Sequence, residues 1–284
     1  MRELDTRART LLSGLRADVQ SGATQLALNT LNELLSYLDE VAPDVEILSR
    51  LLAELRTARP SMIVIGNALA MIEQRLGSDP HAARAAIIDT RDQLQDATTT
   101  IARHAREHLP TTPVIMTHSA SSVVLALFRS MAENQQSFSV ICTQSSPGFE
   151  GHSLARALDE LSVPVTLITD AQMGLFVPEA NVVITGCDTW LDDGCFINKS
   201  GTYLLALAAR AAGKSFWVLA DSFRNSDANP GLVELEEMPA DELNAPEGEW
   251  ITHRNVYFER VPHALVSHRI SEQGVFSYPA GPRR

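Results

Sequence analysis

The chain has 284 residues, 45% of them hydrophobic and 20% charged, and its formal net charge at pH 7 is −12. This composition is globular, and the negative charge disfavours direct nucleic-acid binding, which needs clustered Lys and Arg. No stretch approaches the roughly 20 apolar residues that span a bilayer, and the N-terminus does not resemble a secretory signal. Cys142, Cys187 and Cys195 lack CxxC spacing, which disfavours disulfides and zinc sites and favours a cytoplasmic protein.

Residues 1–108 are predicted to form a helical domain. In "SGATQLALNTLNELLSYL", leucines recur every three to four residues behind a Ser21-Gly22 start, and "DVEILSRLLAELRTA" repeats the pattern. A further helix, "SDPHAARAAIIDTRDQLQDATTTIARHAREHL", is expected to begin with Ser78 as its N-cap and Pro80 near its first turn. Between them, "ARPSM" holds Arg59 extended before a proline. Arg59 is either a solvated arginine or one that points into a cleft between domains.

Residues 109–284 are predicted to form an α/β domain. Short runs rich in Val and Ile have the length of buried strands, and helix-like stretches separate them. This alternation predicts a Rossmann-like, doubly wound parallel sheet after the helical domain. Ligands bind such sheets outside the carboxyl ends of the strands. The expected strands are "PVIMT", "FSVICT", "VPVTLIT", "NVVIT" and "SFWVLA".

The first candidate site, "HSASS" (118–122), follows the first of these strands. Small hydroxyl residues at such a turn can donate backbone N–H and side-chain O–H groups to an anion, or Ser121 and its neighbours can simply cap a helix. We expect His118 to be a hydrogen-bonded structural histidine. No GxSxG nucleophile elbow is present, which disfavours a hydrolase. The next loop, "TQSSPGFEG", is by itself interpreted as an ordinary turn.

The most informative stretch is "TGCDTWLDDGCFINKSGTY" (185–203). Asp188 follows a strand, where a carboxylate can act as a general base or bind a sugar hydroxyl. Lys199 is one of only two lysines in the chain and precedes a helix that begins near Gly201. A lysine at a helix N-terminus opposes the helix dipole, and a bound anion would reverse that effect. Lys199 therefore serves either an anionic ligand or a tight buried contact.

These motifs, in this order, resemble those of a known family. It joins the alpha, beta and delta regulatory subunits of translation initiation factor 2B with methylthioribose-1-phosphate isomerase and ribose-1,5-bisphosphate isomerase. "VIMTHSASSVVL" is similar to the family's Thr-His-x-x-Ser turn, and "ARPSM" to its Arg-Pro-Thr/Ser element. "TGCDTWLDDGCFINKSGT" is similar to its Gly-Ala-Asp…Asp-Gly…Asn-Lys-x-Gly-Thr signature, and "VPHALVSHRISEQGVF" to its closing segment.

The resemblance implies where a site would lie. In the isomerases an aspartate, here Asp188, and a cysteine, here Ser119, carry out an aldose–ketose isomerisation. A serine hydroxyl is a much weaker acid than a thiol, whose pKa is about 8.5. Ser146 also stands where the family usually has an arginine that contacts phosphate. The resemblance further implies that ligand or phosphate contacts come from Arg59, Ser121, Asn198, Lys199, Gly201 and Thr202.

Three functions remain open from the sequence. The first is a regulatory protein that binds a sugar phosphate or nucleotide without the catalytic cysteine. The second is an aldose–ketose isomerase on a phosphorylated pentose, with Asp188 as general acid/base. The third is a translation-factor subunit that contacts initiation factor 2. For all three functions we expect no cofactor or metal, no membrane association, and a homodimer formed through the C-terminal domain. If the protein is a regulator, we also expect it to have a protein partner.

Overall fold

The structure is a computed structural model that describes residues 3–18, 22–59, 62–76, 80–226, 235 and 237–278, with residues 80 and 81 described by their backbone only. Ser21, Pro60, Ser61 and Ser78, for which the sequence predicts turns and a cap, lie outside these residues. The chain divides into two compact units, residues 1–98 with 223–225, and residues 99–222 with 226–284. The predicted domain boundary after residue 108 coincides with the end of a helix that belongs to both units.

Helices build the first unit, as the leucine spacing predicts. Two of them begin at aspartates that accept a hydrogen bond from a backbone N–H three residues later: Asp5 from Ala8 and Asp44 from Ile47. Their apolar faces form one buried core, which includes Leu34, Leu51 and Leu55. The helices are α1 (Thr6–Ala17), α2 (Ala23–Val41), α3 (Val45–Arg56), α4 (Ile63–Arg75) and the first part of α5 (Pro80–His108).

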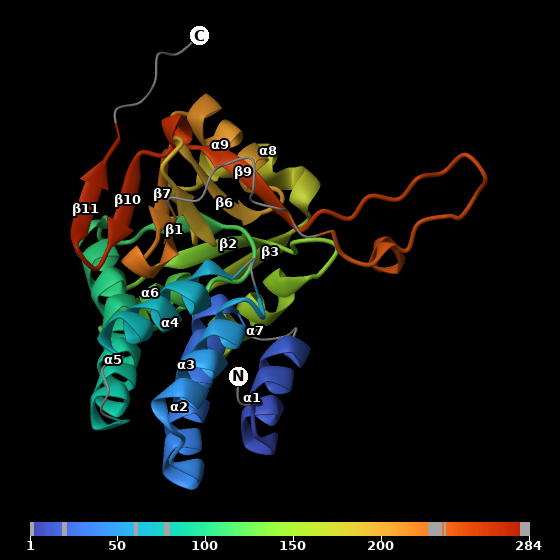
Figure 1. The fold of residues 1–284 in the computed structure, drawn as a ribbon. Helices are drawn as coiled ribbons and strands as arrows, with labels where there is room; N and C mark the ends of the chain where they lie inside the picture. Colours follow the sequence, from blue (N-terminus) through green and yellow to red (C-terminus); the bar gives the residue numbers. More distant parts are fainter. Residues whose placement is uncertain are drawn as a thin grey trace. The chain divides into compact units, whose positions relative to one another are not determined.

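A seven-stranded sheet in the order β11-β10-β7-β4-β1-β2-β3 forms the centre of the second unit (Figure 1). All five predicted strands are present in it and run parallel, and β10 extends them in parallel while β11 pairs antiparallel. This confirms the predicted fold class. The strands are β1 (Val114–Thr117), β2 (Ser139–Thr143), β3 (Val165–Ile168), β4 (Val182–Thr185), β7 (Ser215–Leu219), β10 (His268–Ser271) and β11 (Gly274–Ser277).

Both faces of this sheet are buried under helices. On β1, Ile115 belongs to the core that includes the end of α5, whereas Met116 belongs to the core on the opposite face, as the period of two requires. The first core is covered by α6 (Ser122–Glu133) and α7 (Glu150–Glu160), and the second by α8 (Met173–Phe176) and α9 (Thr202–Ala211). Such double burial explains why the strands are continuously apolar in sequence.

The sequence did not predict a second, antiparallel sheet built on β5 (Thr189–Leu191), β6 (Cys195–Lys199) and β9 (Phe258–Pro262). Since all three residues of β5 are buried, they show no alternation of polar and apolar positions. The acidic turn Asp192–Gly194 joins β5 to β6. This sheet matters for function because β6 ends at Lys199.

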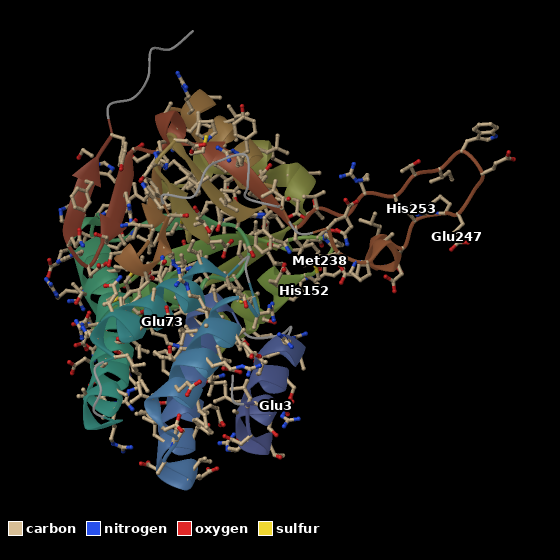
Figure 2. All side chains as sticks on the ribbon, viewed as in Figure 1. Glu3, Glu73, His152, Met238, Glu247 and His253 are labelled. Atoms are coloured by element: carbon tan, nitrogen blue, oxygen red, sulfur yellow. The ribbon has the colours of Figure 1, made fainter. Side chains whose placement is uncertain are left out.

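Before β9, residues 237–257 extend as an arm (Figure 1). A bridge between Glu237 and Val256 closes its base, and Figure 2 shows Glu247 and His253 far out along it. The base is also held by Glu242, whose carboxylate accepts hydrogen bonds from Asn255 Nδ2 at 2.9 Å and from the hydroxyl of Tyr257 at 2.6 Å. The arm therefore places Tyr257 at the start of β9.

Candidate functional site

Polar loops meet at the carboxyl edge of the parallel sheet in the second unit. His118–Ser122 follow β1, Gln144–Phe149 follow β2, and Gly186–Asp188 follow β4. The turn between β6 and α9 joins them, because His118 Nε2 lies 2.8 Å from the carbonyl oxygen of Ser200. The edge at which the sequence predicts a ligand site is thus built from the predicted loops and from a turn of the unpredicted sheet.

His118 is a structural residue, as expected. It is buried, and its Nδ1 lies 2.6 Å from the hydroxyl of Thr143. Since a carbonyl only accepts, Nε2 carries the proton toward Ser200, and Nδ1 accepts from Thr143. Burial lowers the pKa of His118, outweighing nearby carboxylates that raise it. The neutral imidazole therefore ties the end of β1 to β2 and to the β6–α9 turn.

Ser119, which the motif resemblance aligns with the cysteine of the isomerases, is partly exposed and in the left-handed region with φ of 63°. Its backbone N–H donates to Ser145 Oγ at 2.8 Å. The backbone N–H groups of Ser145 and Ser146 in turn donate to the carboxylate of Asp170, at 3.0 and 2.8 Å. The loop interpreted from sequence as an ordinary turn therefore positions Ser119, a role that only contacts between distant residues reveal.

Asp188 is half-buried directly before β5, and its backbone N–H donates to the carbonyl oxygen of Ile197 at 2.9 Å. Ser121 is the N-cap residue of α6, and its side chain makes no capping hydrogen bond there. The Ser121 hydroxyl instead packs against Gly186, where a Cβ would collide with it. The structure therefore brings Ser121 next to the loop that carries Asp188.

Lys199 makes a tight buried contact, which was one of the two alternatives. Its side chain is 6% exposed, and Nζ lies 2.6 Å from Glu150 Oε1. The ammonium also lies 3.3 Å from the ring centroid of Tyr257, a cation–π geometry. Neither partner was singled out in the sequence analysis, because Glu150 lies 49 residues away and Tyr257 precedes an unpredicted strand.

Asn198 and Thr202 hold the turn on which Lys199 lies. Asn198 Nδ2 donates to Thr202 Oγ1 at 2.9 Å, and this hydroxyl donates to the carbonyl oxygen of Lys199 at 2.6 Å. Both side chains are buried. They are thus engaged with each other and with the backbone, and their direct contact with a ligand stays a prediction.

The N-terminus of α9 has an anion supplied by the chain itself. Glu259 Oε1 accepts from the backbone N–H groups of Gly201 and Tyr203, at 2.6 and 2.8 Å. The pairing of β6 with β9 places Glu259 opposite Asn198, so the antiparallel register delivers the carboxylate to this helix end. The sequence predicts an anion here, and the structure identifies an internal one.

Two cysteines lie near strand ends, and Cys142 does not offer an acidic thiol. Cys142 lies in the core beneath α6 and α7, and burial raises its pKa to about 11. Cys187 is buried in the core on the opposite face. Among the described residues, no group of three or more His, Cys, Asp and Glu side chains is arranged to hold a metal ion.

Arg59 lies in the first unit, where its guanidinium donates to the backbone carbonyl of Asp18. Pro60 and Ser61, which complete the predicted motif, lie outside the described residues. The role of Arg59 in phosphate binding stays a prediction. No helix in the described part of the chain combines the length and apolar character needed to cross a bilayer.

Comparison with known proteins gives one consistent result. The model of the Initiation factor 2 subunit family matches residues 6–278. An eIF-2B subunit 2-like protein of Pyrococcus horikoshii is 33% identical over 281 residues, covering 97% of this chain and 98% of the relative. A ribose 1,5-bisphosphate isomerase of Archaeoglobus fulgidus is 29% identical over 266 residues, covering 89% and 84%.

A solved structure agrees with these similarities. The crystal structure of a Pyrococcus horikoshii translation initiation factor eIF-2B has a TM-score of 0.85 and 31% identity, and covers 97% of this chain and 98% of that one. The resemblance drawn from the sequence motifs is therefore confirmed. A relative named for eIF-2B and one named as an isomerase both match over most of this chain, so similarity alone does not choose between a regulatory role and an isomerase.

Proposed function

Because the chain belongs to the Initiation factor 2 subunit family, we propose that it binds a phosphorylated sugar or nucleotide at the carboxyl edge of the second unit and acts as a regulator rather than an isomerase. The observation that carries the proposal is the buried ammonium of Lys199 at an edge where Ser119 replaces the family's thiol. The ammonium can hold a phosphate, whereas a serine hydroxyl is too weak an acid to replace a cysteine.

The alternative is an aldose–ketose isomerase that uses Asp188. Asp188 is half-buried in the loop after β4, two residues from Gly186, against which Ser121 packs, and this position suits a carboxylate that exchanges protons with a ligand. Its substrate would be a phosphorylated pentose such as ribose 1,5-bisphosphate, on which the Archaeoglobus fulgidus relative acts by name. This alternative requires a proton donor other than Ser119 or the buried Cys142, whose pKa of about 11 makes it a weak acid at neutral pH.

An NMR time course with ribose 1,5-bisphosphate and methylthioribose 1-phosphate separates these functions. We expect the signals of a sugar phosphate to broaden without formation of a ketose product. We expect Asp188→Asn to change the affinity of the protein for that sugar phosphate less than threefold. A ketose signal that grows with protein concentration and is lost in Asp188→Asn would establish the isomerase instead. Absence of both broadening and product would contradict ligand binding altogether.

We also propose that the protein is a cytoplasmic homodimer that pairs through its second unit and passes ligand binding on to a protein partner. An exposed apolar face on neighbouring helices supports the pairing: Leu175 of α8 is 66% exposed, and Leu204 and Leu207 of α9 are 65% and 38% exposed. Leu204 and Leu207 lie three residues apart and share one side of α9. Such apolar patches mark protein interfaces.

Replacing Leu204 with Glu is expected to convert the dimer to a monomer, because a carboxylate would be buried without a partner at the interface. The measurement is the molar mass from light scattering during size-exclusion chromatography. Val41→Glu, at an exposed position on α2 in the first unit, is the matched control and should remain a dimer. A wild-type monomer, or a Leu204→Glu dimer, would contradict pairing through this face.

A further inference from the structure

The charge of Lys199 is already neutralised inside the protein. Glu150 Oε1 lies 2.6 Å from Nζ, and the ring of Tyr257 covers the ammonium at 3.3 Å from its centroid. A ligand phosphate that approaches Lys199 therefore meets a neutral ion pair rather than an unopposed positive charge. Its Coulomb attraction to the ammonium is offset by repulsion from the carboxylate beside it.

Two further carboxylates lie close by. Together with Glu150, Asp170 and Glu259 act on the imidazole of His118 in the direction that favours its protonated form. Asp170 accepts two backbone N–H groups of the loop after β2, and Glu259 accepts two at the start of α9. Three carboxylates and one ammonium around a neutral histidine leave this edge with an excess of negative charge.

Glu150 is the least firmly held of these carboxylates. Its Oε2 is buried and accepts no hydrogen bond from the residues that the structure describes, whereas backbone N–H groups satisfy Asp170 and Glu259. A buried polar oxygen without a partner carries a desolvation cost, so the contact with Lys199 is not optimal. Glu150 is also on the first turn of α7, where its charge can be removed without breaking a backbone hydrogen bond of the site.

We propose that Glu150 determines the charge of the ligand that this site accepts: with Glu150 in place, the site binds a sugar carrying one phosphate group in preference to the same sugar carrying two. The inference rests on the proposed function and deepens it. One phosphate can share the ammonium of Lys199 with Glu150. A second phosphate adds negative charge beside the carboxylates of Asp170 and Glu259, and like charges at close range repel strongly at reduced dielectric.

The test compares the affinities of ribose 5-phosphate and ribose 1,5-bisphosphate by isothermal titration calorimetry, for the wild-type protein, Glu150→Gln and Glu160→Gln. Gln keeps the shape of the side chain and removes its charge. Glu160 ends the same helix and is exposed, which makes it the matched control. We expect the wild-type protein to bind the monophosphate at least tenfold more tightly than the bisphosphate. Glu150→Gln should reduce this ratio of affinities at least tenfold, and Glu160→Gln should leave it unchanged.

A second measurement needs no variant. For the wild-type protein, the ratio of the affinity for the monophosphate to that for the bisphosphate should fall as the salt concentration is raised, since screening weakens the repulsion of the second phosphate. A wild-type preference for the bisphosphate, or an unchanged ratio in Glu150→Gln, would overturn the inference while leaving ligand binding intact. If neither ligand binds the wild-type protein or Glu150→Gln, the proposed function fails and this inference with it.

Discussion

Lys199→Ala is expected to weaken binding of ribose 5-phosphate at least a hundredfold, which corresponds to about 2.7 kcal/mol of binding free energy. The variant removes the ammonium that would hold the phosphate and leaves the carboxylate of Glu150 facing the ligand. Calorimetric titration measures the affinity. Lys214→Ala changes the only other lysine of the chain, which lies beyond the end of α9, and should bind as the wild-type protein does.

Lys199→Arg tests whether the site needs a compact ammonium group or only a positive charge. Arginine keeps the charge, but its planar guanidinium is larger than an ammonium and would not fit between the carboxylate of Glu150 and the ring of Tyr257. We therefore expect Lys199→Arg to lose most of the affinity as well. If Lys199→Ala bound the ligand as tightly as the wild-type protein, Lys199 would not contact the ligand, and its ion pair with Glu150 would have only a structural role.

Gly201→Ala is expected to destabilise the protein by about 3 kcal/mol or more, the largest stability effect that we predict. Two costs add. The backbone of Gly201 has φ of 106°, a conformation that costs an L-residue roughly 1–2 kcal/mol. A Cβ would also stand 2.7 Å from His118 Nε2, so the imidazole would have to move away from Ser200 and lose a buried hydrogen bond, at roughly 1–3 kcal/mol.

Gly213→Ala separates these two costs. Gly213 also has a positive φ, of 67°, but a Cβ there would meet no atom within 4 Å. Its substitution should therefore cost only the backbone strain, roughly 1–2 kcal/mol. The free energy of unfolding in urea measures both variants. If the free energy of unfolding fell by the same amount in Gly201→Ala and Gly213→Ala, the close approach of Gly201 to His118 would add nothing to the cost of the Gly201 substitution.

Much of the architecture could be predicted because it depends on local patterns. Leucine spacing indicates the helices of the first unit, and the five runs rich in Val and Ile indicate the five strands that form the parallel core of the sheet. Burial on both faces makes the four central ones, β1, β2, β4 and β7, easy to recognise. The strand β5 was missed because it has only three residues and lacks the alternation that marks a half-buried strand, and β6 and β9 (CFINK and FERVP) lack a continuous run of Val and Ile.

The candidate site divides in the same way. Its position after β1 and β4, and the importance of Asp188 and Lys199, could be proposed from the sequence, since residue types and their order along the chain carry that information. The partners of those residues could not. Glu150 reaches Lys199, and Glu259 reaches the start of α9, across 49 and 58 residues of sequence.

The sequence by itself therefore determined the family and the fold class, and it predicts the edge of the sheet at which a ligand would bind. The tertiary structure alone decided the electrostatic state of that edge, because the charge that a site presents depends on which side chains fold against each other. Lys199, which indicated an anion site, is paired with Glu150, and the backbone N–H groups of the helix end beside it donate to Glu259. The chain itself supplies the anions that the sequence pattern anticipated.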